Sequence, residues 1–156
     1  MPDLFTHFVA ARVPGAFMPD RRVQALFIVG TFLPDLVSKG LYWVTWSPVN
    51  FMAPSHSIVP AALFCYAGAL LLEQRWRERA FAALYGGSLL HIAVDLIKDN
   101  LGSGSAYLLY PFSTVGTEFA WIDPENFVLL IPIDAAILAL VWLYERKKAV
   151  QVHVQQ

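Results

Sequence analysis

Two residues with metal-binding chemistry interrupt an apolar stretch of this chain. The segment "GGSLLHIAVDLIKDN", residues 86–100, carries His91 and Asp95 four positions apart. In a helix, residues at i and i+4 share one face, so the spacing predicts an imidazole next to a carboxylate. Neutral imidazoles and carboxylates are ligands that zinc, manganese and iron accept. Ser88 and Asp99 extend the same face and give the helix a polar stripe.

The composition predicts that this helix lies in a membrane. The chain has 156 residues, of which 57% are hydrophobic and 15% charged, whereas soluble domains carry about a quarter charged residues. The mean hydropathy is +0.51. The net charge of −1 gives no support for nucleic-acid binding. Cys65 is the only cysteine, which excludes an internal disulfide and a thiolate metal cluster, so we expect a buried, inert thiol.

Four apolar stretches predict an all-α membrane protein with four transmembrane helices. They cover residues 23–42, 58–74, 80–98 and 127–144. Each approaches the roughly 20 residues that a helix needs to cross a bilayer. Residues 3–19 are interrupted by Arg12 and prolines, and we expect a short membrane-associated or re-entrant helix there. Residues 1–148 would form a single membrane-embedded domain, followed by a polar tail over residues 149–156.

The basic residues predict the orientation of these spans. They flank the ends that would lie on one side of the membrane: Arg21, Arg22, Arg75, Arg77, Arg79, Arg146, Lys147 and Lys148. The opposite segments, 43–57 and 99–126, contain no lysine or arginine. Because basic loops stay in the cytoplasm, we expect a multi-pass protein of a bacterial or archaeal cytoplasmic (inner) membrane. Its basic loops and C-terminus would be cytoplasmic.

The ionisable residues inside the apolar stretches are predicted to share one depth. At a rise of 1.5 Å per residue, each lies within about 11 Å of the outer end of its predicted span. These residues are Asp35, His56, His91, Asp95 and Asp134. His7 would approach from the N-terminal helix. A charge at the bilayer centre costs roughly 2.5–3.5 kcal/mol, so these groups must meet one another, water or a metal. Asp134 could instead serve helix packing or a proton relay.

Neighbouring residues favour close helix packing around this layer. Pro34 precedes Asp35 and leaves the carbonyl of Gly30 without its helical partner. Gly87, one turn before His91, leaves room for a close neighbour. Ser55, His56 and Ser57 follow Pro54, where the N-terminus of a helix is expected. Lys39 and Lys98 would either extend to the interface or contact a phosphate.

Several short motifs resemble those of the YdjM-like family of inner-membrane metal-dependent hydrolases. They occur in the family's order and cover most of the chain through residue 113: Thr6–His7, "GTFLPDL" at 30–36, "SHS" at 55–57, "GGSLLHIAVDLI" at 86–97 and "LLYPFS" at 108–113. The family is similar in motif order to zinc-dependent phospholipase C and single-strand nucleases. The last span shows little that matches, so the resemblance implies no role for Asp134.

The resemblance implies a metal site and a reaction. Asp35, His56, His91 and Asp95 would form the principal site, and His7 would complete it or hold a second ion. The chain lacks the soluble enzymes' second histidine pair with a following H-x-x-x-E after Asp95, which favours one or two ions, most simply zinc, with manganese or iron as alternatives.

The leading hypothesis is therefore an enzyme, a metal-dependent hydrolase that cleaves a phosphoester in a membrane lipid or a lipid-linked phosphate. Asp35 or Asp99 would accept the proton of the attacking water, and Lys98 would stabilise the developing charge. Residues 99–119 would cover the site from outside. Two alternatives remain open. One is a non-catalytic membrane protein that uses the metal for structural stability or for binding a partner, and the other is a small proton-coupled transporter.

Overall fold

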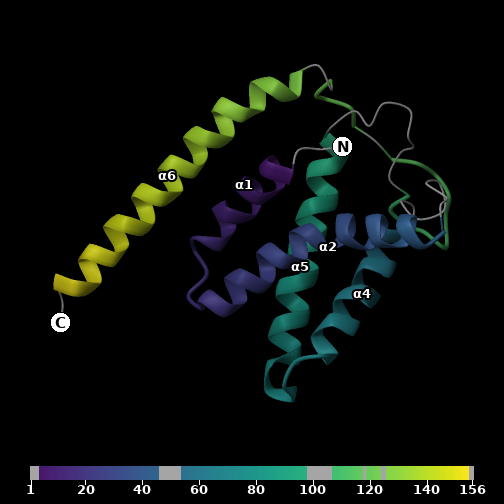
Figure 1. Cartoon of the computed structure of the whole chain (residues 1–156), viewed down its shortest axis with the longest axis horizontal. Helices are drawn as coiled ribbons and strands as arrows, with labels where there is room; N and C mark the ends of the chain where they lie inside the picture. The colour runs from purple at the N-terminus through teal and green to yellow at the C-terminus, as the bar shows by residue number, and fades with distance from the viewer. Residues whose placement is uncertain (1–3, 46–53, 98–106, 118, 124–125, 155–156) are drawn as a thin grey trace.

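The regular secondary structure of the described residues is helical. The computed structural model describes residues 4–45, 54–97, 107–117, 119–123 and 126–154, and in these ranges it contains five α-helices and no β-strand. They are α1 (Leu4–Gly15), α2 (Arg21–Thr45), α4 (Ile58–Leu70), α5 (Arg77–Ile97) and α6 (Phe127–Val154), with a 3₁₀ turn, η1 (Gln74–Trp76), before α5 (Figure 1). The predicted all-α class is confirmed.

Each predicted apolar stretch coincides with one helix, but the helices differ in length and polarity. By length and composition, Gln74–Ile97 and Val128–Lys148 are long and apolar enough to cross a membrane. Helix α4 is apolar but has only 13 residues, about 20 Å of rise against a hydrocarbon core of about 30 Å. Helix α2 has 25 residues and carries Asp35 and Lys39 within its apolar part.

Helices α2 and α5 cross in direct backbone contact. In Figure 1, α2 lies across the middle of α5. A Cβ atom added to Gly30 would lie 2.1 Å from the carbonyl oxygen of Leu84, and one added to Gly87 would lie 2.1 Å from that of Phe27. Only glycine permits this approach, which is how small residues let membrane helices pack closely. The predicted role of Gly87 is confirmed.

A hydrogen bond occupies the carbonyl that Pro34 leaves free. The hydroxyl of Ser88 on α5 donates to the carbonyl oxygen of Gly30 at 2.9 Å. The sulfur of Cys65 on α4 lies 3.3 Å from the same hydroxyl, and its side chain is fully buried, as the sequence predicts. Three helices therefore meet around Ser88, one turn before His91.

The N-terminal segment predicted as a short helix forms α1, which packs against α2, α5 and α6. Helix α6 packs mainly on α1 and runs beside it at a distance from α5 in Figure 1. Arg12 on α1 and Glu145 on α6 form an ion pair at 2.7 Å. Most other side chains of α6 point away from the protein, including Val128, Leu140 and Trp142, which are each more than half exposed.

The basic starts of α2 and α5 are neighbours. The guanidinium groups of Arg22 and Arg79 lie 5.4 and 5.8 Å from the centre of the Trp76 ring, just before α5. In Figure 1, α2 begins towards the left, α5 begins at the bottom and α6 ends at the lower left.

Candidate metal site

The site is centred on the helix pair His91 and Asp95. Nε2 of His91 lies 3.0 Å from Oδ2 of Asp95, so the two side chains share one face of α5, as their spacing predicts. Both are buried; His91 is fully inaccessible. The crossing at Gly87 holds this face of α5 against α2, and the face cannot turn away while the two backbones remain in contact.

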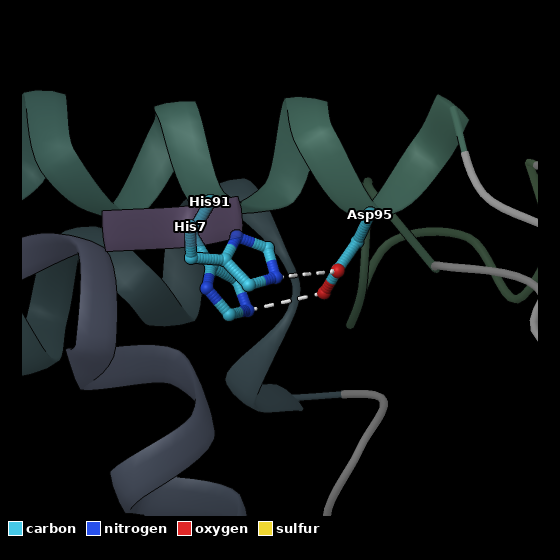
Figure 2. A group of neighbouring side chains, drawn as sticks. All are labelled: His7, His91 and Asp95. Atoms are coloured by element: carbon cyan, nitrogen blue, oxygen red, sulfur yellow. Dashed lines mark ion pairs between the residues drawn. The ribbon is translucent and has the colours of Figure 1, made fainter. Parts of the chain in front are cut away.

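Helix α1 contributes His7 to the same cluster. The rings of His7 and His91 are stacked with centroids 4.1 Å apart, and Nε2 of His7 lies 3.1 Å from Oδ1 of Asp95. Figure 2 shows both imidazoles facing the one carboxylate, each opposite a different oxygen. His7 is fully buried. Asp95 therefore lies between two imidazoles from helices far apart in the sequence.

Helix α2 and the segment before α4 complete the cluster with Asp35 and His56. Nε2 of His56 lies 3.2 Å from Nε2 of His91 and 3.5 Å from Oδ2 of Asp95. Oδ1 of Asp35 lies 3.7 Å from Nε2 of His56 and 3.9 Å from Nε2 of His91. Two buried groups that could hold a metal ion result: His7, His91 and Asp95, and Asp35, His56 and His91.

These separations match the spacing of ligand atoms around a metal ion. Zinc binds nitrogen and oxygen at about 2.0–2.1 Å in tetrahedral geometry, which puts neighbouring ligand atoms about 3.3 Å apart. Nε2 of His56 and Nε2 of His91 lie 3.2 Å apart. An ion bound to both nitrogens could take its third ligand from Asp95 on one side or from Asp35 on the other. The donor set contains only imidazole and carboxylate groups, which suits zinc, manganese or iron.

A hydroxyl orients His56. Its Nδ1 lies 2.8 Å from Oγ of Ser55, which is itself buried. When Nδ1 carries the proton and donates it to Ser55, Nε2 keeps its lone pair for a metal, the usual arrangement of a ligating histidine and its outer partner. Ser57, the residue before the first turn of α4, donates to the carbonyl oxygen of Tyr107 at 2.6 Å. Ser55 therefore contacts the ring of His56, whereas Ser57 attaches the start of α4 to Tyr107.

Lys39 borders the site on the side of Asp35. Its Nζ lies 3.0 Å from Oδ2 of Asp35, and its side chain is 37% exposed against 11% for the Asp35 side chain. The sequence left open whether Lys39 reaches the interface or a phosphate; it forms an ion pair with Asp35. His7 and His91 are sealed inside, so this pair is the accessible edge of the cluster.

The end of α5 and the start of α4 are covered by backbone from the segment before α6. The amides of Phe119 and Trp121 donate to the carbonyl oxygens of Leu96 and Ile97 at 2.9 Å each. The amide of Ile58 donates to the carbonyl of Leu108 at 3.0 Å. The described part of the predicted covering segment is therefore tied to the end of α5 and the start of α4.

The structure brings together all five residues predicted as metal ligands: His7, Asp35, His56, His91 and Asp95. Lys98 and Asp99, predicted to act in catalysis, lie outside the described residues. Asp134 belongs to neither group of potential ligands; its Oδ2 accepts a hydrogen bond from the Thr6 hydroxyl at 2.7 Å. Sequence reasoning assigned no site role to Thr6 and no orienting role to Ser55. Their positions next to His7 and His56 are the only signal that the sequence offers.

Comparisons of this chain with protein-family models, with curated proteins and with solved structures found no match. The resemblance to the YdjM-like family therefore rests on the short motifs, and the site rests on its own geometry.

Proposed function

We propose that this protein is a membrane-embedded hydrolase that uses a divalent metal ion to cleave a phosphoester in a lipid or lipid-linked substrate. The observation that carries the proposal is the pair of buried groups sharing His91. Each offers three protein ligands. Three ligands leave a position for water or substrate, which is typical of catalytic zinc sites, whereas structural zinc sites have four protein ligands.

The residues around the cluster have distinct roles in this proposal. A divalent ion held by these residues would supply a bound water with a pKa near 7 and would polarise the phosphoryl oxygen. His7, His91 and Asp95 would hold the buried part of the site. Asp35 would bind the ion through Oδ1, which faces His56 and His91. Its other oxygen, Oδ2, would accept a proton from the attacking water, and Lys39, 3.0 Å from Oδ2, would receive the anionic group of the substrate. Lys98 and Asp99, which follow α5, remain proposed for charge stabilisation and proton transfer.

The exposed side chains of α6 support a membrane location. A soluble protein can contain an apolar helix of this length when its core covers that helix, but α6 is covered mainly by α1 on one side. Large apolar side chains remain exposed along it, among them Leu129, Ile133, Leu140 and Leu143. Lipid would remove this surface from water. We propose that α2, α5 and α6 cross the membrane, that the 13-residue α4 crosses only part of the hydrocarbon core, that α1 is membrane-associated, and that the basic ends face the cytoplasm.

The resemblance to the YdjM-like hydrolases and, through them, to phospholipase C supports the reaction class, and we propose membership of that family. A lipid phosphate fits the location, because the accessible edge at Asp35 and Lys39 lies towards the end of α2 opposite to the basic one. The substrate would approach from the outer leaflet.

Hydrolysis of defined lipids tests the proposal. Zinc-loaded protein in detergent would be given phosphatidic acid, a phosphomonoester, and phosphatidylglycerol, a phosphodiester, and the released phosphate and diacylglycerol measured. We expect turnover of one class, its loss with a chelator and its loss in His91→Ala. The matched control is His153→Ala, in the last turn of α6, which should keep wild-type activity. Absence of turnover on both lipids by zinc-loaded wild type would contradict the proposal.

The two carboxylates on either side of His91 favour a second candidate, a metal that stabilises the bundle without catalysis. Asp35 and Asp95 both have an oxygen within 3.9 Å of Nε2 of His91. If both bound the ion held by His56 and His91, four protein ligands would close its coordination shell. This candidate predicts that chelation lowers the melting temperature of a protein that hydrolyses neither lipid.

The described part of the chain gives less support to a transporter. The buried polar side chains cluster around the site, whereas the buried positions of residues 21–30 and 77–87 are apolar or glycine. A proton or ion path would need polar groups along that half of the bundle.

A further inference from the structure

Helix α6 carries one side chain that differs from the rest of its surface. Between residues 128 and 148, Asp134 is the only buried residue; the others are exposed or half-buried. An apolar residue would pack against α1 without the cost of burying a carboxylate in an apolar setting. Helix packing alone therefore does not explain why a carboxylate occupies this position.

The partner of Asp134 points to its role. The hydroxyl of Thr6 donates to Oδ2 of Asp134 at 2.7 Å, the usual distance of an O–H···O hydrogen bond. Thr6 directly precedes His7, whose ring stacks on His91 and faces Asp95. Because α6 packs mainly on α1, this hydrogen bond is a polar link from α6 to the part of α1 that enters the site.

We propose that Asp134 is a positioning residue that fixes His7 in the metal site through the hydroxyl of Thr6. The inference rests on the proposed metal site and adds a residue that neither the ligand set nor the motifs contain. The bond resists sliding and rotation of the first turn of α1. Such a movement would carry the His7 imidazole away from Asp95, with which it makes its 3.1 Å contact.

The second link between the two helices provides a matched control. Arg12 and Glu145 form their ion pair further along α1, at the end away from His7. If α6 only stabilised α1 in general, breaking either link would affect the site similarly. If Asp134 positions His7, only the link through Thr6 matters for metal binding.

Cobalt binding tests the inference, because Co²⁺ reports its ligands by visible absorption. Thr6→Val should weaken Co²⁺ binding by less than the roughly 10- to 100-fold that removal of a direct outer partner of a ligand causes, because the hydroxyl holds His7 only through the backbone of α1, and it should change the spectrum. Thr6→Ser, which keeps the hydroxyl, should restore both. Asp134→Asn, which keeps an acceptor of nearly the same shape, should weaken binding less than Thr6→Val. Glu145→Gln should bind as wild type.

The outcomes separate this inference from the proposed metal site. Wild-type protein that binds neither Co²⁺ nor Zn²⁺ would overturn the metal site itself. Wild type that binds Co²⁺, together with Thr6→Val of unchanged affinity and spectrum, would overturn only the role of Asp134. Equal losses in Thr6→Val and Glu145→Gln would also overturn it, since general docking of α6 would then explain both. Should Thr6→Val fail to fold, Asp134→Leu, which removes the acceptor of the hydrogen bond, would have the same meaning if its affinity and spectrum were those of wild type.

Discussion

Replacing Gly87 by alanine tests how the helix crossing shapes the site. The new Cβ would lie 2.1 Å from the carbonyl oxygen of Phe27, about 0.9 Å short of the 3.0 Å below which real Cβ contacts are essentially never found. The obstacle is backbone, which cannot rotate away as a side chain can. Helices α2 and α5 must therefore separate by roughly 1 Å at the crossing.

This separation acts directly on the ligand atoms. Asp35 lies on α2 and His91 on α5, and their facing atoms are 3.9 Å apart across the crossing. Metal–ligand distances must hold to about 0.2 Å, so a shift of about 1 Å removes Asp35 from any ion held by His91. Overpacking of this kind also costs about 1–3 kcal/mol of stability. We expect Gly87→Ala to bind zinc at least tenfold more weakly and to melt several degrees lower.

Competition with a zinc chelator and thermal unfolding in detergent measure the two effects. The matched control is Gly40→Ala on α2, where a Cβ would meet nothing within 4 Å. Alanine in a helix is about 1 kcal/mol more favourable than glycine, so this control should keep its zinc affinity and be slightly more stable. Wild-type zinc affinity in Gly87→Ala would refute the link between the crossing and the ligand geometry.

Three further predictions concern the surroundings of the ligands. Ser55→Ala should weaken zinc binding about 10- to 100-fold, because Nδ1 of His56 loses its hydrogen-bond partner. Ser57→Ala should keep the wild-type zinc affinity, because the Ser57 hydroxyl bonds Tyr107. Equal affinities of the two variants in a chelator titration would contradict the role of Ser55. Zinc affinity should fall as the pH falls, because protons compete with the metal for the imidazole nitrogens; a zinc affinity independent of pH, measured by chelator competition, would contradict histidine ligation. Cys65→Ala should keep the wild-type zinc content, because the thiol is buried against Ser88 away from the cluster, and a loss of zinc would show that ligand geometry depends on this contact.

The residues of the site could be predicted because their rarity makes them informative. In apolar helices an ionisable side chain is costly, so each histidine and aspartate there marks a position that must find a partner. The helical repeat then placed His91 next to Asp95. The same local reasoning found the free carbonyl of Gly30 and the close approach at Gly87, both of which the structure confirms.

Contacts between helices could not be predicted in the same way. The pairing of Thr6 with Asp134 joins residues 128 positions apart, and it depends on how α6 docks on α1. The ion pair between Lys39 and Asp35 was within reach, since the two are one turn apart on α2, but a lysine near a helix end also has the option of extending to the interface. The length of α4 depends on where its backbone turns after Leu70, which apolar composition does not indicate.

The measurement that tests the account most directly is the zinc content of the detergent-purified, zinc-loaded protein. Asp95 faces the imidazoles of His7, His56 and His91 within 3.5 Å. Wild type and His153→Ala should therefore retain one or two zinc ions per chain after dialysis, and Asp95→Asn and His91→Ala should retain fewer. Wild-type protein without zinc, or equal zinc in all four proteins, would contradict the metal site on which the proposed function depends.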